Sequence, residues 1–356
     1  MRILVPIIFF LSSLQLHAQT SAPKYSNEFL SIGVDARALG MSKATIASVS
    51  DVSAGYWNPA ALVDGDYEFS GALMHSSYFS GIANFDYMAF SARIDSMSNI
   101  GVSVIRFAVD DIPDTRFLYD ANGSISYDRV RFFSAADYAF LLSYSRKFKN
   151  IPQLSVGANF KIVYRNVGQF ANAWGFGLDV GAKYRVKTWA FGVMARDITG
   201  TFNMWSHNSS LLIDVYTQTG NEIPENTIEV TLPRFIFGVA KTFKAFEKFG
   251  ILAELNLETT LDGKRNTLVK SGTVSLAPVA GIELDYSKIA YLRFGVGNFQ
   301  QIKDFDGSLS TSYQPNFGLG IVIKNLKIDY ALTDIGNQAE ALYSHVFSLK
   351  FGWDSK

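Results

Sequence analysis

Few side chains in this sequence could perform catalysis. The chain has no cysteine and only four histidines, His17, His75, His207 and His345. A hydrolase of the Ser-His-Asp type would therefore depend on one of these imidazoles lying beside a serine. His17 lies in an apolar N-terminal segment, His207 in a long loop, and His345 among alternating apolar residues. Only His75 lies in a strand where it could face a polar interior, and the sequence offers it no partner. We predict that the protein is not an enzyme.

Metal and nucleotide chemistry have equally little support. The His, Asp and Glu residues form no group with the spacing of metal ligands on one face of an element. The glycine-rich runs at 175–181 and 295–297 are not followed by a helical pattern, so we interpret them as strand glycines rather than phosphate-binding loops. Lys+Arg and Asp+Glu both total 32, which provides no overall basic field for nucleic acid. We predict no cofactor, no metal and no nucleic-acid partner.

The start of the chain predicts export from the cytoplasm. Arg2 is followed by the apolar run 3–16 and by Leu16-His17-Ala18. A charged start, a short hydrophobic centre and a small-residue end are typical of a secretory signal peptide. We place cleavage after Ala18, so that residues 1–18 are the signal peptide. No later segment has the ~20 consecutive apolar residues that a transmembrane helix needs.

The polar and apolar residues that follow residue 66 alternate with a period of two. In the segment 154–165, Leu154, Val156 and Phe160 share one face, while Asn159 and Lys161 lie on the other. We expect fourteen such strands, near 67–78, 84–94, 99–109, 136–147, 153–165, 173–186, 188–199, 228–243, 249–260, 277–286, 289–297, 316–324, 326–333 and 343–353. An even number of two-faced strands predicts an all-β, closed antiparallel transmembrane barrel, because hydrocarbon cannot satisfy an open sheet edge.

The links between these strands alternate in length. Short links such as 186–187 and 287–288 alternate with long ones such as 110–135 and 200–227. Short periplasmic turns and long extracellular loops alternate in this way in outer-membrane barrels. We therefore predict an outer-membrane, multi-pass barrel over 67–356 that contacts outer-membrane lipid, with both termini in the periplasm. Residues 19–66, which are rich in Gly, Ala and Ser, are predicted to form a plug, or hatch, inside the lumen.

The predicted plug carries a motif that resembles a known family. Three runs form the motif: Asp35-Ala36-Arg37-Ala38-Leu39-Gly40-Met41, Asp51-Val52-Ser53-Ala54 and Tyr56-Trp57-Asn58-Pro59-Ala60-Ala61-Leu62. It resembles the opening signature of the PorV/PorQ outer-membrane proteins, a group similar to the FadL transporters. Small residues allow a backbone to pack closely, and an Asn-Pro pair forces a turn. We therefore assign a structural role in the plug to Arg37, Gly40, Met41, Asp51, Trp57, Asn58 and Pro59. Their charged members are expected to pair with inward residues such as Lys161, Asp179, Lys327 and Asp329.

The resemblance implies two different functions. The PorV group implies a non-enzymatic component of the type IX secretion system of Bacteroidetes. Such a protein binds a secreted cargo protein through the C-terminal β-domain of the cargo. It then shuttles the cargo to other translocon components or anchors it at the cell surface. The FadL side implies passive transport of a long-chain fatty acid or another hydrophobic compound. A purely structural barrel is a third possibility.

The two longest predicted loops, 110–135 and 200–227, contain more apolar residues than a solvated loop needs. Such loops either pack on themselves or offer a docking surface to another protein, and the sequence leaves both alternatives open. If they dock a partner, large aromatic and apolar side chains are the expected anchors. The candidate partner-binding residues are Phe117, Tyr119, Phe132, Met204, Trp205, Leu212 and Tyr216.

Overall fold

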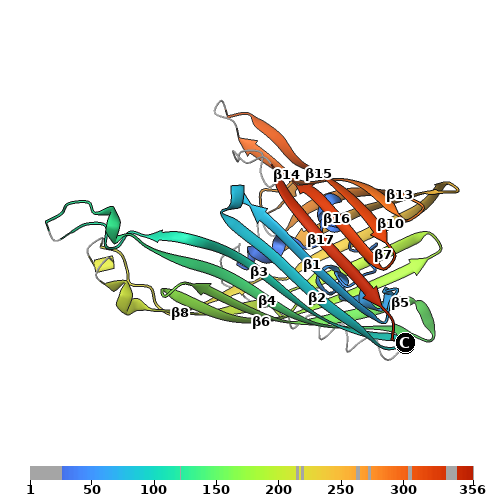
Figure 1. Cartoon of the computed structure of the whole chain (residues 1–356), viewed down its shortest axis with the longest axis horizontal. Coiled ribbons are helices and arrows are strands. Elements are labelled where there is room, and N and C mark those ends of the chain that lie inside the picture. Colours follow the sequence, from blue (N-terminus) through green and yellow to red (C-terminus); the bar gives the residue numbers. More distant parts are fainter. Residues whose placement is uncertain are drawn as a thin grey trace.

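The strands close into a barrel. The computed structural model describes residues 26–355, except 121, 214–215, 218–219, 262–264, 272–273, 304–306 and 334–342. The predicted signal peptide lies outside these residues. Seventeen strand segments form one antiparallel sheet (Figure 1). The sheet closes because β1 (Phe69–Tyr78) pairs on one side with β2 (Ala83–Asp95) and on the other with the last strand, β17 (Ser344–Trp353).

The seventeen segments make fourteen wall strands, as predicted. β7 (Trp189–Arg196) and β8 (Thr201–His207) both pair with β6 (Ala171–Val186), so they are two parts of one strand. In the same way β9 (Thr227–Thr231) continues β10 (Arg234–Phe246), and β12 (Val269–Lys270) is a short hairpin arm. The remaining strands are β3 (Ser98–Asp114), β4 (Arg131–Phe148), β5 (Ile151–Val167), β11 (Phe249–Thr260), β13 (Ser275–Tyr286), β14 (Ala290–Lys303), β15 (Leu309–Ile323) and β16 (Leu326–Thr333). Because β8 is a strand, the predicted loop 200–227 is shorter than expected.

The outer face of the wall is apolar between two aromatic rows. Along β17 the residues alternate strictly, with Trp353 and His345 pointing outward and Lys350 pointing inward. The rings of Phe69, Phe90, Phe351 and Trp353 pack together near the short turns. Residues 345 and 353 are eight steps apart, which corresponds to about 20 Å of height at ~3.4 Å per residue and a tilt of ~40°. This height suits the hydrocarbon layer of an outer membrane. No helix in the described part of the chain is long and apolar enough to cross a membrane.

His75 lies on the outer face, not in the lumen where we expected it. Its Nδ1 atom is 2.7 Å from Oδ1 of Asp86, whose other oxygen accepts from Arg106 at 3.0 Å. The neighbours Met74 and Ser76 are buried toward the interior, so the period of two forces His75 outward. The prediction placed His75 in the correct strand, the first, but on the wrong face of that strand.

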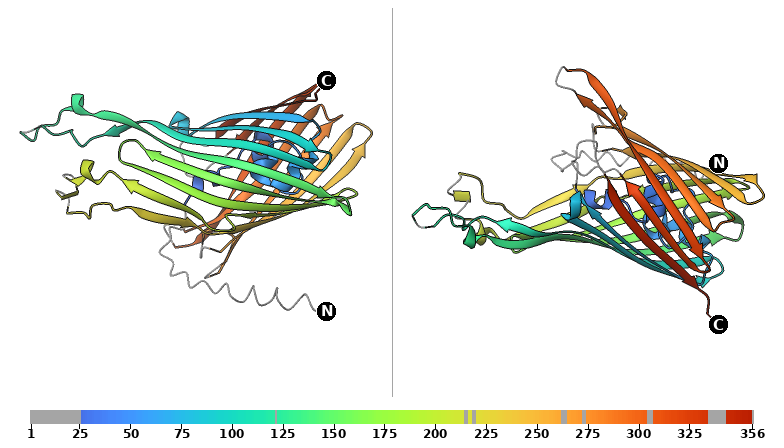
Figure 2. Two further views of the ribbon diagram at one scale, coloured as in Figure 1. Left: turned by 90° about the horizontal axis from the view of Figure 1, so that it is seen from below. Right: turned by 45° about the horizontal axis from the view of Figure 1, so that its top comes forward.

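The two ends of the barrel differ. Short turns join the strands at the end where the C-terminus lies, and long hairpins occupy the other end (Figure 2). On one side, β3 to β6 and β8 continue well past the barrel body, at the left of Figure 1. We call this extension the wing; its described residues are 107–120, 122–137, 165–173, 203–213, 216–217 and 220–229. Hairpin β14–β15 rises separately on another side of the barrel.

The segment that precedes β1 fills the lumen, as the blue trace inside the strands shows (Figures 1 and 2). It contains four short helices, η1 (Glu28–Ser31), α2 (Ala36–Gly40), α3 (Ala54–Trp57) and η2 (Pro59–Asp64). Most of its side chains are small and fully buried, and they form the centre of the hydrophobic core together with inward residues of β1 to β3. The segment is therefore a plug.

Candidate functional site: a sealed lumen and an open vestibule

The plug meets the wall backbone to backbone at inward-facing glycines. A Cβ atom added to Gly40 would lie 2.8 Å from Cα of Gly318 on β15. One added to Gly157 on β5 would lie 2.4 Å from the backbone of Pro59 and Ala60. Gly192, Gly281 and Gly295 approach the plug in the same way, at Ile46 and Met41. Real Cβ contacts are never this short, so only glycine fits, and no gap for a solute remains at these positions.

Lys350 of the last strand holds the plug at two carboxylates. Its Nζ atom lies 2.6 Å from Oδ2 of Asp35 and 2.7 Å from Oδ2 of Asp51. Asp329 of β16 lies 3.8 Å from the same ammonium, and its side chain is fully buried. Ser348, also on β17, accepts from the backbone N–H of Ala36 at the start of α2. The strand that closes the barrel thus binds the plug directly.

Arg37 extends this charged cluster to the next strands. Its Nε donates to Oε2 of Glu283 on β13 at 2.9 Å. Arg293 on β14, which is completely buried, donates to the same carboxylate at 2.6 Å and to Asp329 at 2.8 Å. Breaking one member of such a buried network leaves an uncompensated charge in a medium of low dielectric constant. The plug is therefore fixed by charge as well as by shape.

The remaining motif residues shape the plug internally. Trp57 donates its indole N–H to the carbonyl of Val34 at 3.0 Å. The Asn58 amide donates to the carbonyls of Ile46 and Ala182, while its oxygen accepts from the N–H of Ala60 at 3.2 Å. Asn58 therefore caps η2, with Pro59 at the first position of that helix. These contacts are structural.

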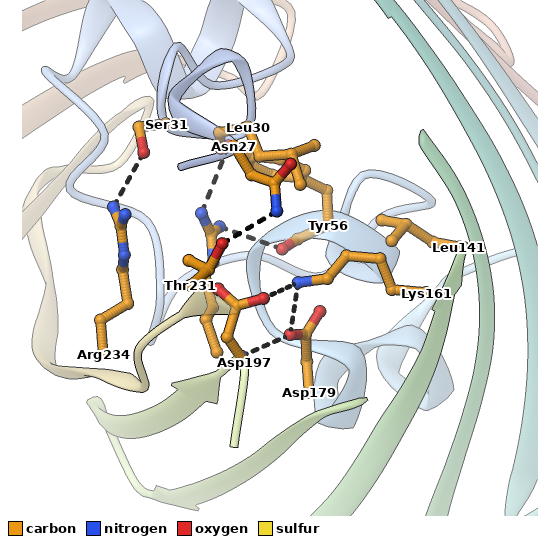
Figure 3. A pocket seen from close by; sticks show the side chains of 11 residues that line it. Asn27, Leu30, Ser31, Tyr56, Leu141, Lys161, Asp179, Asp197, Thr231 and Arg234 are labelled. Carbon is orange, nitrogen blue, oxygen red and sulfur yellow. Dashed lines mark hydrogen bonds and ion pairs between the residues drawn. The ribbon is translucent and has the colours of Figure 1, made fainter. Parts of the chain in front are cut away.

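A second buried network lies where β7 is interrupted before β8. Lys161 on β5 places its Nζ atom 3.0 Å from Oδ1 of Asp179 and also contacts the carboxylate of Asp197, which has a positive φ of 54°. Figure 3 shows both ion pairs beside Tyr56 of the plug. The guanidinium of Arg196 covers the Tyr56 ring at 4.4 Å. The cavity between them has only about 20 Å³, room for one water molecule.

A far larger cavity, of about 610 Å³, lies on the other side of the plug, toward the long hairpins. We call it the vestibule. Its apolar lining comes from both plug and wall: Phe29, Ile32, Leu39, Tyr78, Phe79 and Phe107. Its charged lining residues are Lys43, Asp137, Arg165 and Glu258, and Asp137 is the cross-strand neighbour of Phe107. The vestibule is therefore amphipathic.

The charged side chains that line the vestibule already have ion-pair or hydrogen-bond partners within the protein. Arg165 donates to both oxygens of Asp137, at 2.9 and 3.0 Å, a bidentate geometry that fixes the guanidinium plane. Glu258 accepts from Arg234 at 3.1 Å, and Lys43 donates to the carbonyl of Ser31 at 2.7 Å. Because these groups already have partners, a polar ligand would have to compete for them, whereas an apolar ligand would only displace water.

The candidate partner-binding residues of loop 110–135 lie at the tip of the wing. Tyr119 and Phe132 are 62% and 65% exposed. Phe117 is partly enclosed, because the guanidinium groups of Arg116 and Arg131 lie 5.4 and 4.7 Å from its ring centroid. Of the two alternatives for these loops, packing on themselves therefore describes Phe117 better than it describes Tyr119 and Phe132.

The candidates of the second loop divide between two faces. Met204 and Trp205 are neighbours in β8, so they point to opposite sides of the sheet. Met204 is exposed on the outer face, whereas Trp205 faces the vestibule side and lies 5.0 Å from the guanidinium of Arg165. Leu212 and Tyr216 are half-buried after β8 and share a backbone hydrogen bond of 3.0 Å. The seven candidates do not form one patch.

The apolar lining of the vestibule was not predicted from the sequence. One signal for it exists in β3, whose inward positions Asn99, Gly101 and Ser103 are polar or small before Ile105 and Phe107 become apolar. Ile105 is still buried in the core that includes the plug, and Phe107, the next inward residue, borders the vestibule. Among the described residues, no group of three His, Asp or Glu side chains could hold a metal ion.

The fold matches several solved outer-membrane barrels. The Ralstonia pickettii toluene transporter TbuX superposes with a TM-score of 0.54 at 14% identity, over 90% of this chain and 98% of TbuX. The Pseudomonas putida toluene transporter TodX gives 0.55 at 13% identity, over 91% and 99%. The CymD monoaromatic hydrocarbon channel gives 0.55 at 12% identity, over 91% and 98%. Identities this low show a common fold and no more. Neither a family model nor a curated protein sequence matches the chain.

Proposed function

We propose that this protein is a non-enzymatic outer-membrane barrel that takes up a hydrophobic or amphipathic small molecule through the vestibule. In this proposal the long hairpins face the outside of the cell and both termini face the periplasm. The observation that carries the proposal is the cavity of about 610 Å³ between plug and wall, with Phe29, Leu39 and Phe107 among its lining residues. Proteins of the same fold described as toluene transporters and a monoaromatic hydrocarbon channel support it.

The vestibule suits a ligand with an apolar body. Cavities that bind small molecules commonly have 300–1,000 Å³ and a mostly apolar lining with a few polar groups. Burial of about 200 Å² of apolar ligand surface against Phe29, Leu39 and Phe107 would contribute about 5 kcal/mol before the losses of binding entropy. The proposed direction of transfer is set only by the concentration gradient, since nothing in the barrel supplies energy.

The test is ligand binding to the purified barrel. Toluene and a long-chain fatty acid are titrated calorimetrically in detergent, with the wild type and with Phe29→Ala/Phe107→Ala. We expect at least one ligand to bind the wild type and to bind the variant about tenfold or more weakly, because each ring removes roughly 1.5–3 kcal/mol of apolar contact. Phe132→Ala, on the exposed wing tip, is the control and should bind like the wild type. Equal binding by all three proteins would contradict the vestibule as the site.

A second candidate function, cargo docking in a type IX secretion system, is favoured by a different observation. Tyr119, Tyr127 and Phe132 at the wing tip are 62%, 77% and 65% exposed. Aromatic side chains in such positions commonly serve as interface anchors worth ~2 kcal/mol or more. The partner would be a secreted protein with a C-terminal β-domain or a translocon component.

Co-purification from the native membrane distinguishes the two candidates. Trp205→Ala/Phe117→Ala should reduce recovery of a secreted partner, while heat-modifiable gel mobility shows that the barrel still folds. Tyr119→Ala/Phe132→Ala tests the more exposed anchors in the same way. If partner recovery stays unchanged in both variants and ligand binding is lost in Phe29→Ala/Phe107→Ala, the docking candidate is wrong.

A further inference from the structure

The lumen has another cavity at the end of the short turns, of about 300 Å³, which the proposed function does not use. The plug contributes Asp64, the last residue of η2, and the remaining lining residues come from β4, β5, β6 and the turn that follows β6. These are Lys147, Pro152, Gln153, Ser155, Lys183, Arg185 and Lys187. Four of the eight lining side chains are cations and one is an anion, so the cavity carries an excess of three positive charges.

Three of the cations converge on the single carboxylate. Lys147 places its Nζ atom 2.7 Å from Oδ1 of Asp64. Lys183 and Arg185 share Oδ2, at 3.1 and 3.4 Å. Lys183 has only 1% of its side chain exposed and also donates to the carbonyl of Val49 in the plug. Burial alone would raise the pKa of Asp64, but Lys183 and its basic neighbours hold that pKa below the ordinary value. The single negative charge of Asp64 therefore cannot neutralise the three cations that contact it.

The remaining positive charge is available to a ligand. The Arg185 side chain is 50% exposed and reaches Asp64 only with a long contact, so most of its five donors point elsewhere. Lys187 is exposed in the β6–β7 turn, and no ion pair to it occurs among the residues that the structure describes. Like charges gathered in a partly desolvated cavity repel one another, and a bound anion would relieve that repulsion.

We propose that this cavity binds a phosphate group, which its four basic side chains and Ser155 surround. A tetrahedral oxyanion with two or more negative charges matches an excess of three cations better than a second carboxylate would. Arginine and lysine are also the side chains that bind phosphate oxygens through charge-assisted hydrogen bonds. Lys147, Ser155 and Lys183 all lie on the inward face of their strands. The cavity therefore opens to the mouth of the lumen, which favours a soluble phosphate compound over a lipid headgroup.

The test uses the full-length barrel in a maltoside detergent, which contains no phosphate. Inorganic pyrophosphate is titrated calorimetrically at constant ionic strength, with chloride as the competing anion. We expect one binding site in the wild type and binding about tenfold or more weaker in Arg185→Gln/Lys187→Gln, because one or two charge-assisted hydrogen bonds are lost. The matched control is Lys244→Gln/Lys248→Gln, which removes the same charge from exposed positions at the end of β10 and in the turn that follows it, at the same end of the barrel.

A variant with the opposite expected effect guards against misfolding as the explanation. Asp64→Asn removes the only anion of the cavity and should bind pyrophosphate more tightly than the wild type. If pyrophosphate does not bind, but phosphatidylglycerol is retained by the wild type and lost from Arg185→Gln/Lys187→Gln in native mass spectrometry, the phosphate comes from a lipid headgroup. Absence of both ligands, or equal loss in the Lys244/Lys248 control, would overturn the proposal.

Discussion

The lumen around the plug and the vestibule next to it are built from opposite kinds of contact. Around the plug, glycine backbones touch it directly, and buried ion pairs such as Lys350–Asp35 leave no space where they form. In the vestibule, rings such as Phe29 and Phe107 border an open cavity of about 610 Å³. Glycine contacts and ion pairs therefore hold the plug against the wall, whereas apolar side chains border the cavity where we propose that a ligand binds.

The largest effect should come from removing most of β17, the last wall strand. Truncation before Phe347 deletes most of β17, which pairs with β1 and β16 and carries Lys350. Both neighbours would then have open edges in the membrane, which hydrocarbon cannot satisfy. We expect complete loss of the folded, heat-modifiable form on gels. A folded form that survives the truncation would show that β17 does not close the barrel.

A smaller effect is expected when the seal loses one charge but the wall stays intact. Lys350→Met leaves the carboxylates of Asp35 and Asp51 without their shared cation, at a cost of about 3–5 kcal/mol. The plug should loosen, and the conductance of planar bilayers should rise. Ligand binding in the vestibule should weaken only if the plug residues that line it, such as Phe29 and Leu39, move. The control Lys327→Met alters a more exposed lysine 4.0 Å from Asp329 and should change conductance less. Equal conductance of Lys350→Met and wild type would contradict the charge seal.

The glycine contacts can be tested without altering any charge. Gly40→Leu places a side chain where the first added carbon would lie 2.8 Å from Gly318, and overpacking of this kind costs about 1–3 kcal/mol. Solute leak should increase moderately. Gly65→Leu is the control, since its nearest neighbour would lie at an ordinary 3.4 Å. If the barrel folds and both variants leak no more than the wild type, close packing is not what seals the lumen.

The smallest effect concerns pH. Because Lys183 and its neighbours lower the pKa of Asp64 in the folded protein, the ionised carboxylate contributes stability above its ordinary pKa of about 4, and this contribution is lost as the pH falls through the lower folded value. The difference in urea midpoint between wild type and Asp64→Asn should be constant from about pH 6 to 5 and shrink below about pH 4. A difference that varies between about pH 6 and 5 would contradict the assignment.

The barrel itself could be predicted from sequence because its two faces meet two different solvents. In the segment 154–165 every apolar residue that was assigned to the outer face, such as Phe160, does point outward, and Lys161 points inward. The membrane imposes the period of two so strongly that all fourteen wall strands could be located. The extent of the wing could not, because strands beyond the membrane no longer need an apolar outer face. β8 was missed for a different reason: Phe202 and Met204 keep an apolar outer face, but the positive φ angles of Asp197 and Gly200 interrupt the strand before them.

The partners of the plug could not be predicted either. The parity of a strand residue indicates which face it occupies, but not its height along the lumen. Asp35 and Asp51 were expected to meet cations such as Lys161, yet Lys161 pairs with Asp179 and Asp197, and Lys350 holds the plug. Height depends on strand tilt and stagger, which a single sequence does not encode locally.

The position of Lys350 also sets an order of events during assembly. The plug lies near the start of the chain, and Lys350 lies in the last strand. Asp35 and Lys350 are 315 residues apart in the sequence. Until β17 has joined β1 and β16, Asp35 and Asp51 lack the ammonium of Lys350, and the unfinished barrel holds its plug by shape and by ion pairs to other strands such as Arg37–Glu283. Insertion of the final strand would then complete the wall and fasten the first-made segment in a single step, so that a barrel with an open seam is also one with a loose plug.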